Sequence, residues 1–375
     1  MTNSLSRAEF GRLSLAGLLA AACHRADKIT QKSSAPGAGH NATSSPSASA
    51  QRGPTAGGAP AVQDSEVPSA GVPKRKLGGT GELVSMIGLG GAHIGKKEKL
   101  SDSESIRLMR DAIEGGITFF DNCWDYNDGL SEERMGKALR DGYRKRVFLM
   151  TKLDGRTAKS ASEQLEQSLE RLQTDVIDLV QIHEVIRMTD AERSFASDGV
   201  IGALQKAKQA GKIRFIGFTG HKDPQMHLHM LETAKKAGFQ FDALQLPLNV
   251  MDAHFKSFEQ HVLPVAVERG LGVLGMKSMG SGDILKANIV TAQECLRYAL
   301  SLPTSVVITG IDSPEVLAQD LKLAREFKPL SADERRELLA RTAAAAKDGA
   351  HELFKTANKY DGTAKNPKWL ERAEL

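Results

Sequence analysis

Short apolar runs alternate with longer amphipathic stretches along this chain from Lys74 onward. The short runs are rich in branched and aromatic side chains and are bounded by polar or glycine-containing segments, as expected of strands buried on both faces. Eight runs are predicted as strands, namely Val84–Gly91, Thr118–Cys123, Val147–Leu153, Ile177–Val185, Ile213–Thr219, Ala243–Leu248, Gly272–Met279 and Ser305–Ile311.

Between these runs, apolar residues recur every three or four positions, as Leu165, Leu169 and Leu172 do. This spacing places them on one face of a helix. Glycines such as Gly211 and Gly270 follow several of these segments, as glycines at helix C-termini do. The predicted helices include Glu104–Glu114, Ser160–Leu172, Val200–Ala210, Met226–Ala237, Phe258–Glu268 and Ala292–Leu300.

Eight strands alternating with helices over about 240 residues predict an α/β fold, a parallel (β/α)8 TIM barrel with one core. A doubly wound open sheet is the alternative, and it usually carries a Gly-x-Gly-x-x-Gly turn after its first strand. The segment Gly88-Leu89-Gly90-Gly91-Ala92-His93 lacks the third glycine, which favours the barrel. We place this domain at residues 74–345, with an extra C-terminal helix from Ser331. A polar tail over 346–375 is expected either to cover the barrel mouth or to pack outside it.

The first 73 residues differ from the rest in composition and in their pattern of apolar residues. Residues 1–23 resemble an export signal, with Arg7 and Arg12 before the uncharged run Leu13–Ala22, which is too short to span a bilayer. The segment resembles a twin-arginine signal in which Ala8 replaces the second arginine, and its end resembles a lipoprotein box at Cys23. We therefore expect export to the periplasm or cell envelope, with a cytoplasmic protein as the alternative. Any membrane contact is expected through this leader or a lipid anchor only.

Residues 24–73 are rich in Ser, Ala, Gly and Pro and almost free of large apolar side chains, which predicts a flexible linker. In the whole chain of 375 residues, 41% are hydrophobic and 26% are charged, as in an ordinary soluble globular protein. The net charge of +4 is spread along the chain and gives no indication of nucleic-acid binding.

Four polar residues fall at or just after the C-terminal ends of predicted strands, where TIM barrels carry their active sites. They are Asp121, Tyr126, Lys152 and His183. A free tyrosine titrates near pH 10, so we expect Lys152 to lower the pKa of Tyr126, and Asp121 to keep the lysine charged. A histidine can orient a substrate carbonyl. No side chain supplies a hydride, so this set implies a nicotinamide cofactor.

These residues lie in motifs that resemble the aldo-keto reductases over about two thirds of the chain, from Lys76 to Arg325. The motifs include Phe119–Tyr126, Phe148–Lys152 and Asp178–His183. The resemblance implies reduction of an aldehyde or ketone by NAD(P)H, or the reverse oxidation of an alcohol. Asp121, Tyr126, Lys152 and His183 would form the catalytic tetrad, with Tyr126 as proton donor. Trp124 and His93 would line the substrate pocket.

The resemblance also implies a cofactor site, for either NADP(H) or NAD(H). Its expected members are Gly91, Thr219, Gly220, His221, Gln245, Met276, Lys277, Gly310, Asp312, Gln319 and Asp320. Many NADPH-specific members hold the 2′-phosphate with a lysine and an arginine, whereas this chain has Gly310 and Val316 there, with Asp312 adding a negative charge. NADH use is therefore open.

Two other functions compete with this hypothesis. His183, Glu184, His221 and His254 lie near predicted strand ends, and such residues bind zinc in metal-dependent barrel hydrolases and isomerases. Some relatives of the aldo-keto reductases, such as potassium-channel beta subunits, bind nucleotide and act mainly as regulatory partners. We expect no metal, and a small-molecule carbonyl or alcohol as the substrate.

Overall fold

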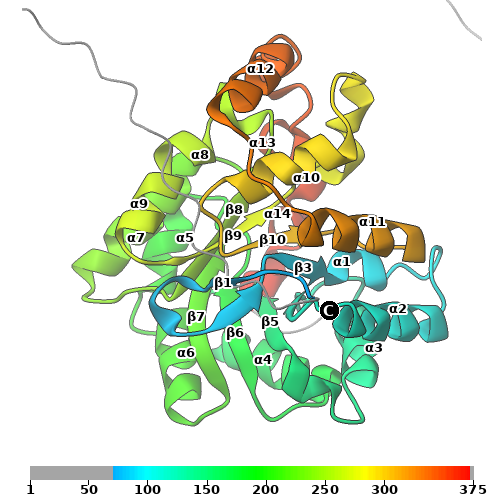
Figure 1. Cartoon of the computed structure of the whole chain (residues 1–375). Helices are drawn as coiled ribbons and strands as arrows, with labels where there is room; N and C mark the ends of the chain where they lie inside the picture. The colour runs from blue at the N-terminus through cyan, green and yellow to red at the C-terminus, as the bar shows by residue number, and fades with distance from the viewer. Residues whose placement is uncertain (1–70, 372–375) are drawn as a thin grey trace, which may run out of the picture. The chain divides into compact units, whose positions relative to one another are not determined.

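A computed structural model describes residues 71–371, so the predicted leader and residues 24–70 of the predicted linker lie outside the described part. Eight parallel strands close into a barrel in the order β10-β3-β4-β5-β6-β7-β8-β9 (Figure 1). The strands are β3 (Ile87–Gly90), β4 (Phe119–Asp121), β5 (Phe148–Leu153), β6 (Ile177–Ile182), β7 (Ile213–Thr219), β8 (Ala243–Pro247), β9 (Gly272–Met276) and β10 (Val306–Thr309). The predicted (β/α)8 barrel is confirmed.

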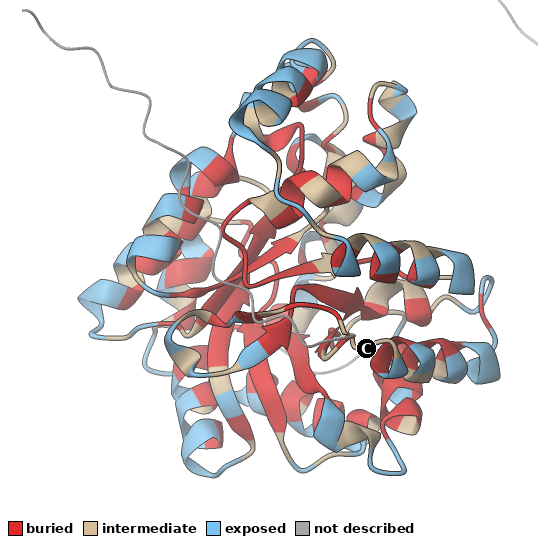
Figure 2. Ribbon diagram, in the orientation of Figure 1, coloured by how far each residue is buried: buried red, intermediate tan, exposed pale blue. Residues whose placement is uncertain are grey.

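Helices surround the barrel and turn their exposed faces outward, while the strands at the centre are almost wholly buried (Figure 2). They are α1 (Gly91–Ile94), α2 (Asp102–Glu114), α3 (Leu130–Ala138), α4 (Ala158–Leu172), α5 (Thr189–Ser194), α6 (Val200–Gln209), α7 (Pro224–Lys236), α8 (Phe258–His261), α9 (Leu263–Glu268), α10 (Ala292–Ser301), α11 (Pro314–Arg325), α12 (Ala332–Thr342), α13 (Leu353–Thr356) and α14 (Gly362–Lys365). None of these helices is long and apolar enough to cross a membrane.

Local sequence signals set the ends of several helices. The Ser101 hydroxyl accepts a hydrogen bond from the Glu104 amide, and the Glu104 carboxylate accepts one from the Ser101 amide, which forms a capping box at the start of α2. One predicted helix is interrupted in the structure. The segment Phe258–Glu268 forms two short helices, α8 and α9, and Pro264 in the first turn of α9 has no amide hydrogen to continue α8.

The first predicted strand, Val84–Gly91, also divides in two. Its first part, β2 (Leu83–Ser85), pairs antiparallel with β1 (Lys74–Lys76), and only β3 joins the barrel. Leu77 in the turn of this hairpin packs with Val84 against side chains inside the barrel, including Phe119, Phe148 and Val306 at the starts of their strands. The hairpin therefore closes the N-terminal end of the barrel and leaves the C-terminal end for a site.

Residues at both ends of the barrel domain pack more extensively than the sequence indicated. Val72, within the predicted linker, is buried and belongs to the main core. The segment 347–371, here called the strap, begins beyond α12 and contains α13 and α14, drawn in red in Figure 1. Its Trp369 packs edge-on against Trp124, and its Leu370 carbonyl accepts a hydrogen bond from the Arg156 amide beyond β5. The strap thus reaches the C-terminal side of the barrel, and the predicted polar tail is folded structure up to residue 371.

Candidate active site

A cavity of about 630 Å³ opens at the C-terminal end of the barrel. Strand ends contribute Lys152, Thr219 and Met276 to its lining, and the strap contributes Lys359 and Tyr360. Further lining residues are Ala92, His93, Lys96, Lys99, Asp125, Tyr126, His183, Glu184, His221, Lys277, Ser281, Asp312, Gly362 and Lys365. The C-terminal strand ends and the strap therefore form one site.

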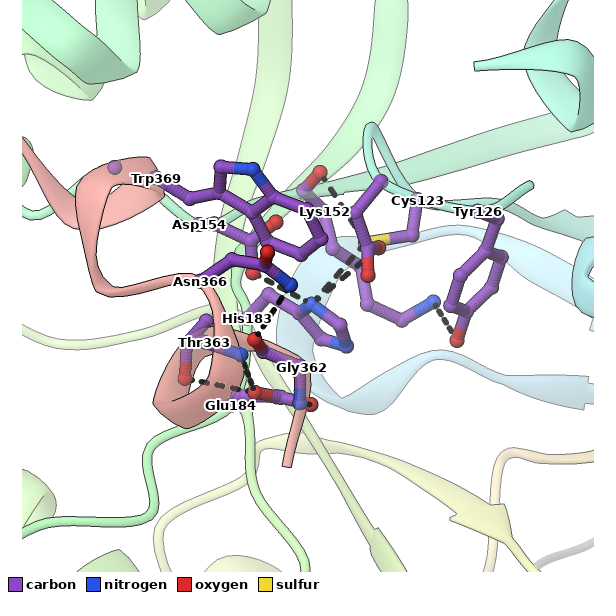
Figure 3. A network of polar contacts seen from close by, with 12 residues as sticks. Cys123, Tyr126, Lys152, Asp154, His183, Glu184, Gly362, Thr363, Asn366 and Trp369 are labelled. Atoms are coloured by element: carbon purple, nitrogen blue, oxygen red, sulfur yellow. Dashed lines mark hydrogen bonds and ion pairs between the residues drawn. The ribbon is translucent and has the colours of Figure 1, made fainter. Parts of the chain in front are cut away.

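The four residues of the predicted tetrad meet at this end of the barrel. The Lys152 ammonium is buried, pairs with the Asp121 carboxylate, and donates to the Asn122 carbonyl at 2.7 Å and to the Tyr126 hydroxyl at 3.4 Å (Figure 3). The Tyr126 and His183 rings meet edge to face with centroids 6.0 Å apart. A phenol and an imidazole thus face the same cavity, and a lysine held in place lies behind the phenol.

The charge state of Tyr126 differs from the prediction. We expected Lys152 to lower its pKa, but burial and the nearby carboxylates, Asp121 first among them, raise the pKa of Tyr126 well above its ordinary value. Burial is the largest cause, and the contact of the Lys152 ammonium with the phenol is long, at 3.4 Å. Tyr126 is therefore a neutral phenol, which carries the proton that a general acid needs.

His183 has a carboxylate partner that the sequence analysis missed. Its Nδ1 lies 2.9 Å from Oδ1 of the buried Asp154, 3.2 Å from the Cys123 sulfur and 3.7 Å from the Asp125 carboxylate (Figure 3). Asp154 is two residues beyond Lys152, and residues two apart in a strand point to the same face. That spacing was the available signal for it.

Of the two residues predicted to line the substrate pocket, His93 does so and Trp124 does not. His93 lines the cavity, and its ring packs on Gly310, where a Cβ would lie 2.5 Å from the ring. Trp124 does not line it. Its indole NH donates to Gln167 at 2.7 Å on α4, and its ring packs against Trp369 of the strap. Trp124 is completely buried in the main core between α4 and the strap, so the structure does not place it on the cavity wall as predicted.

The predicted cofactor residues divide into two groups. Thr219, His221, Met276, Lys277 and Asp312 line the cavity. Gly91, Gly220, Gln245, Gly310, Gln319 and Asp320 do not.

Gln245 belongs to the second group but lies close to the tetrad. Its Nε2 donates to Asp121 at 2.8 Å, whereas its buried Oε1 has no hydrogen-bond partner among residues 71–371. Gln319 faces a separate groove between α10 and α11, and Asp320 is buried in α11. The structure therefore does not bring Gln319 and Asp320 to the site.

Close packing requires glycine at two positions of the second group, Gly91 and Gly220. A Cβ on Gly220 would lie 2.3 Å from the Val185 carbonyl oxygen, and one on Gly91 would lie 2.8 Å from the Asp121 carbonyl oxygen. Both positions therefore bring backbone close to backbone beside the cavity and leave no space for a larger side chain.

Lys277 is the unusual cation of the site. Its backbone has a φ of 55°, and Glu184 on the opposite rim has a φ of 48°, a conformation that costs energy in residues with a Cβ and is concentrated at functional sites. The Lys277 ammonium lies near the Phe354 and Tyr360 rings, at 5.5 and 5.0 Å from their centroids, and makes no hydrogen bond or ion pair with any described residue. Burial lowers its pKa to about 8. A half-buried ammonium without a hydrogen-bonding or ionic partner among the described residues is suited to an anionic ligand.

The alternative metal site is not assembled as predicted. His254 lies outside the cavity and bonds Thr342, and His221 bonds Asp361 at 3.1 Å. The Glu184 carboxylate accepts hydrogen bonds from the strap. Among the described residues, the potential ligands that do lie together are Cys123, Asp125, Asp154 and His183.

The model of the aldo/keto reductase family matches residues 86–294, which is more than half of the chain. The chain belongs to the aldo/keto reductase family. The predicted resemblance is confirmed, and the family does not favour a metal-dependent hydrolase or isomerase.

Several family members are similar to this chain. L-galactose dehydrogenase of Arabidopsis thaliana is 35% identical over 156 residues, which is 39% of this chain and 48% of that protein. The uncharacterized oxidoreductase YrpG of Bacillus subtilis is 29% identical over 239 residues, 57% of this chain and 70% of that one. Among solved structures, an aldo-keto reductase from Bacillus halodurans has a TM-score of 0.61 at 24% identity, with 74% of this chain and 99% of that chain covered. That structure supports the fold.

Proposed function

We propose that this aldo/keto reductase reduces an aldehyde or ketone to an alcohol with NAD(P)H, or catalyses the reverse oxidation. The observation that carries the proposal is the contact of Lys152 with both Asp121 and the Tyr126 hydroxyl, beside His183, on one cavity. A phenol held against a fixed lysine, with an imidazole beside it, is a suitable arrangement for protonating a carbonyl oxygen.

The residues present fit a nicotinamide nucleotide. The unpartnered Oε1 of Gln245 is a buried acceptor that a carboxamide NH would satisfy, and the unpaired Lys277 ammonium would hold a phosphate. Thr219 and Met276 line the cavity between them. When bound, the nicotinamide supplies the hydride.

The chain's own residues perform the proton chemistry in this proposal. Tyr126 holds the proton on its hydroxyl and delivers it to the substrate oxygen. Lys152 cannot move, since Asp121 and the Asn122 carbonyl both hold its ammonium. Tyr360 and the strap lysines Lys359 and Lys365 line the cavity on the strap side.

The test is turnover on a panel of aldehydes and ketones, followed at 340 nm with NADPH and with NADH. We expect reduction of at least one compound by one of the two nucleotides. Tight nucleotide binding without turnover on any compound would contradict the proposal and favour a regulatory role.

We also propose that the leader exports the protein to the periplasm or cell envelope, on the strength of its charged start and its uncharged run. Fractionation of cells that produce the full chain, followed by mass spectrometry of the N-terminus, tests this. Recovery of full-length protein in the cytoplasm only would contradict it.

A further inference from the structure

His183 is fixed from the side that faces away from the cavity. Its Nδ1 lies 2.9 Å from Asp154 Oδ1, and Asp154 is completely buried. Its Nε2 has no hydrogen-bond partner among the described residues, while the residue lines the cavity. Figure 3 shows the ring between Asp154 on one side and Tyr126 on the other. The imidazole thus has one nitrogen bound to protein and one available to a ligand.

One buried guanidinium holds both partners of this pair in place. Arg156 donates to the Asp154 carbonyl at 2.8 Å, to the His183 carbonyl at 2.6 Å and to the Glu184 carbonyl at 3.0 Å. Arg156 is itself paired with the buried Asp190. The loop after β5 and the loop after β6 are therefore locked together, so the distance between Asp154 and His183 does not depend on mobile side chains.

The surroundings of His183 are predominantly acidic. The groups that face it are the carboxylates of Asp125, Asp154 and Glu184, the Cys123 thiol and the Tyr126 phenol. The lysines that line the same cavity are Lys96, Lys99, Lys152, Lys277, Lys359 and Lys365. Burial alone would lower the pKa of His183, but Asp154 and Asp125 outweigh it, so that the pKa lies above its ordinary value. Burial and the neighbouring Asp154 also raise the pKa of Asp125 to about 7. Two of the carboxylate oxygens, Asp125 Oδ1 and Asp154 Oδ2, are buried without a hydrogen-bond partner in the described chain.

We propose that Asp154 is a positioning residue that holds His183 as an imidazolium, with Nδ1–H bonded to Asp154 and Nε2–H directed at the substrate oxygen beside Tyr126. A neutral imidazole with its proton on Nδ1 would present a lone pair to the carbonyl oxygen and repel it. The second proton converts this nitrogen into a charged donor. This inference rests on the proposed function and assigns the role of one additional residue within it.

The positive charge of His183 would also offset the cost of forming a phenolate at Tyr126. When Tyr126 gives its proton to the substrate oxygen, a phenolate forms next to Asp121 and Asp125, which disfavour it. A fixed cation beside the phenol offsets this cost. In the balanced step, the hydride adds to the carbonyl carbon, the π electron pair moves to oxygen, and Tyr126 supplies the proton. The nucleotide is oxidised, the carbonyl is reduced, and His183 keeps its proton.

The test compares Asp154→Asn with the unaltered enzyme. Asparagine keeps the size and one oxygen acceptor but removes the charge, so we expect kcat at pH 8 to fall roughly ten- to a hundredfold, as for loss of a charge-assisted interaction. The high-pH limb of the kcat profile should move to lower pH, and the Kd for NADPH should stay within twofold. Asp125→Asn is the second variant and should shift the limb in the same direction by less, because Asp125 is farther from Nδ1.

A direct measurement keeps this inference separate from the proposed function. Nitrogen NMR of ¹⁵N-histidine protein gives the protonation state of His183 without turnover, with His183→Gln to assign the signal. We expect His183 to lose its second proton at a lower pH in Asp154→Asn than in the unaltered protein. An unchanged titration of His183 in both variants would overturn the proposal, as would stoichiometric zinc on Cys123, Asp125, Asp154 and His183 in the purified protein. Failure of every carbonyl substrate would count against the proposed function alone.

Discussion

The Glu184 carboxylate receives two hydrogen bonds from Thr363, one from the backbone amide and one from the hydroxyl, both at 2.7 Å, and a third from the Gly362 amide at 2.8 Å. These bonds join the loop after β6 to the strap. Burial would raise the pKa of Glu184, but His183, His221 and the Thr363 bonds outweigh it and the pKa is lowered. Glu184 is therefore ionised, and its carboxylate holds the strap in place beside the cavity.

Replacement of Glu184 by alanine should loosen the strap. Three bonds to a buried carboxylate are lost, so we expect a decrease in the free energy of unfolding of about 1–3 kcal/mol, a higher KM for the carbonyl substrate and faster proteolysis of the strap. Thermal unfolding and limited proteolysis measure these effects. Thr363→Val is the matched control, since it removes the hydroxyl alone and should give a smaller effect. Equal stability of Glu184→Ala and the unaltered protein would contradict this role.

Tyr126→Phe should remove the proton donor and little else. We expect turnover to fall by about a hundred- to ten-thousandfold, the usual contribution of general acid catalysis, with the nucleotide Kd within twofold of normal. Steady-state kinetics and a fluorescence titration with NADPH measure the two quantities. Activity near that of the unaltered protein would show that another group donates the proton.

Lys277→Met should weaken nucleotide binding. Loss of a charge-assisted hydrogen bond to a phosphate corresponds to roughly a ten- to hundredfold rise in Kd, whereas Lys277→Arg should keep most of the affinity. The pKa of about 8 gives a pH dependence as well. Lysine is charged below its pKa, so affinity should be highest below pH 8 and should fall as the pH rises through it. A Kd with the same pH profile in Lys277→Met and in the unaltered protein would refute this assignment.

Asp312 should influence the choice between NADPH and NADH. Its carboxylate pairs with Lys99 at 2.6 Å on the cavity wall. We expect Asp312→Ser to lower the Kd for NADPH several-fold relative to that for NADH, because it removes a repulsive charge and frees Lys99 for a phosphate. Parallel titrations with both nucleotides measure the ratio, and Lys99→Met in the same background should reverse the gain. A ratio that stays constant in both variants would place the 2′-phosphate elsewhere.

The barrel could be predicted from sequence because its determinants are local. Short apolar runs, caps such as Ser101 and glycines after helices act within a few residues of where they stand. The tetrad could be located for the same reason, since Asp121, Lys152 and His183 lie at or next to strand ends. The fold then brings strand ends together without further information.

The remaining features depend on contacts between distant segments. The raised pKa of Tyr126 results from burial and from carboxylates on several loops, and the position of Trp124 depends on Gln167 and Trp369. The path of the strap depends on partners such as Glu184, which lies 178 residues before Gly362 in the chain. A polar segment without a long apolar face carries little local signal for such docking, and this explains why it was predicted as a tail.

The strap gives the protein two separately encoded parts of one active site. The four tetrad residues stand on β4 and β5 or in the loops that follow β4 and β6, whereas Lys359, Tyr360 and Lys365 come from a single stretch near the C-terminus. Substitutions in that stretch can alter which molecules enter without disturbing the chemistry beneath. The strap and the barrel can therefore be varied independently, with ligand entry set by the first and the tetrad geometry by the second.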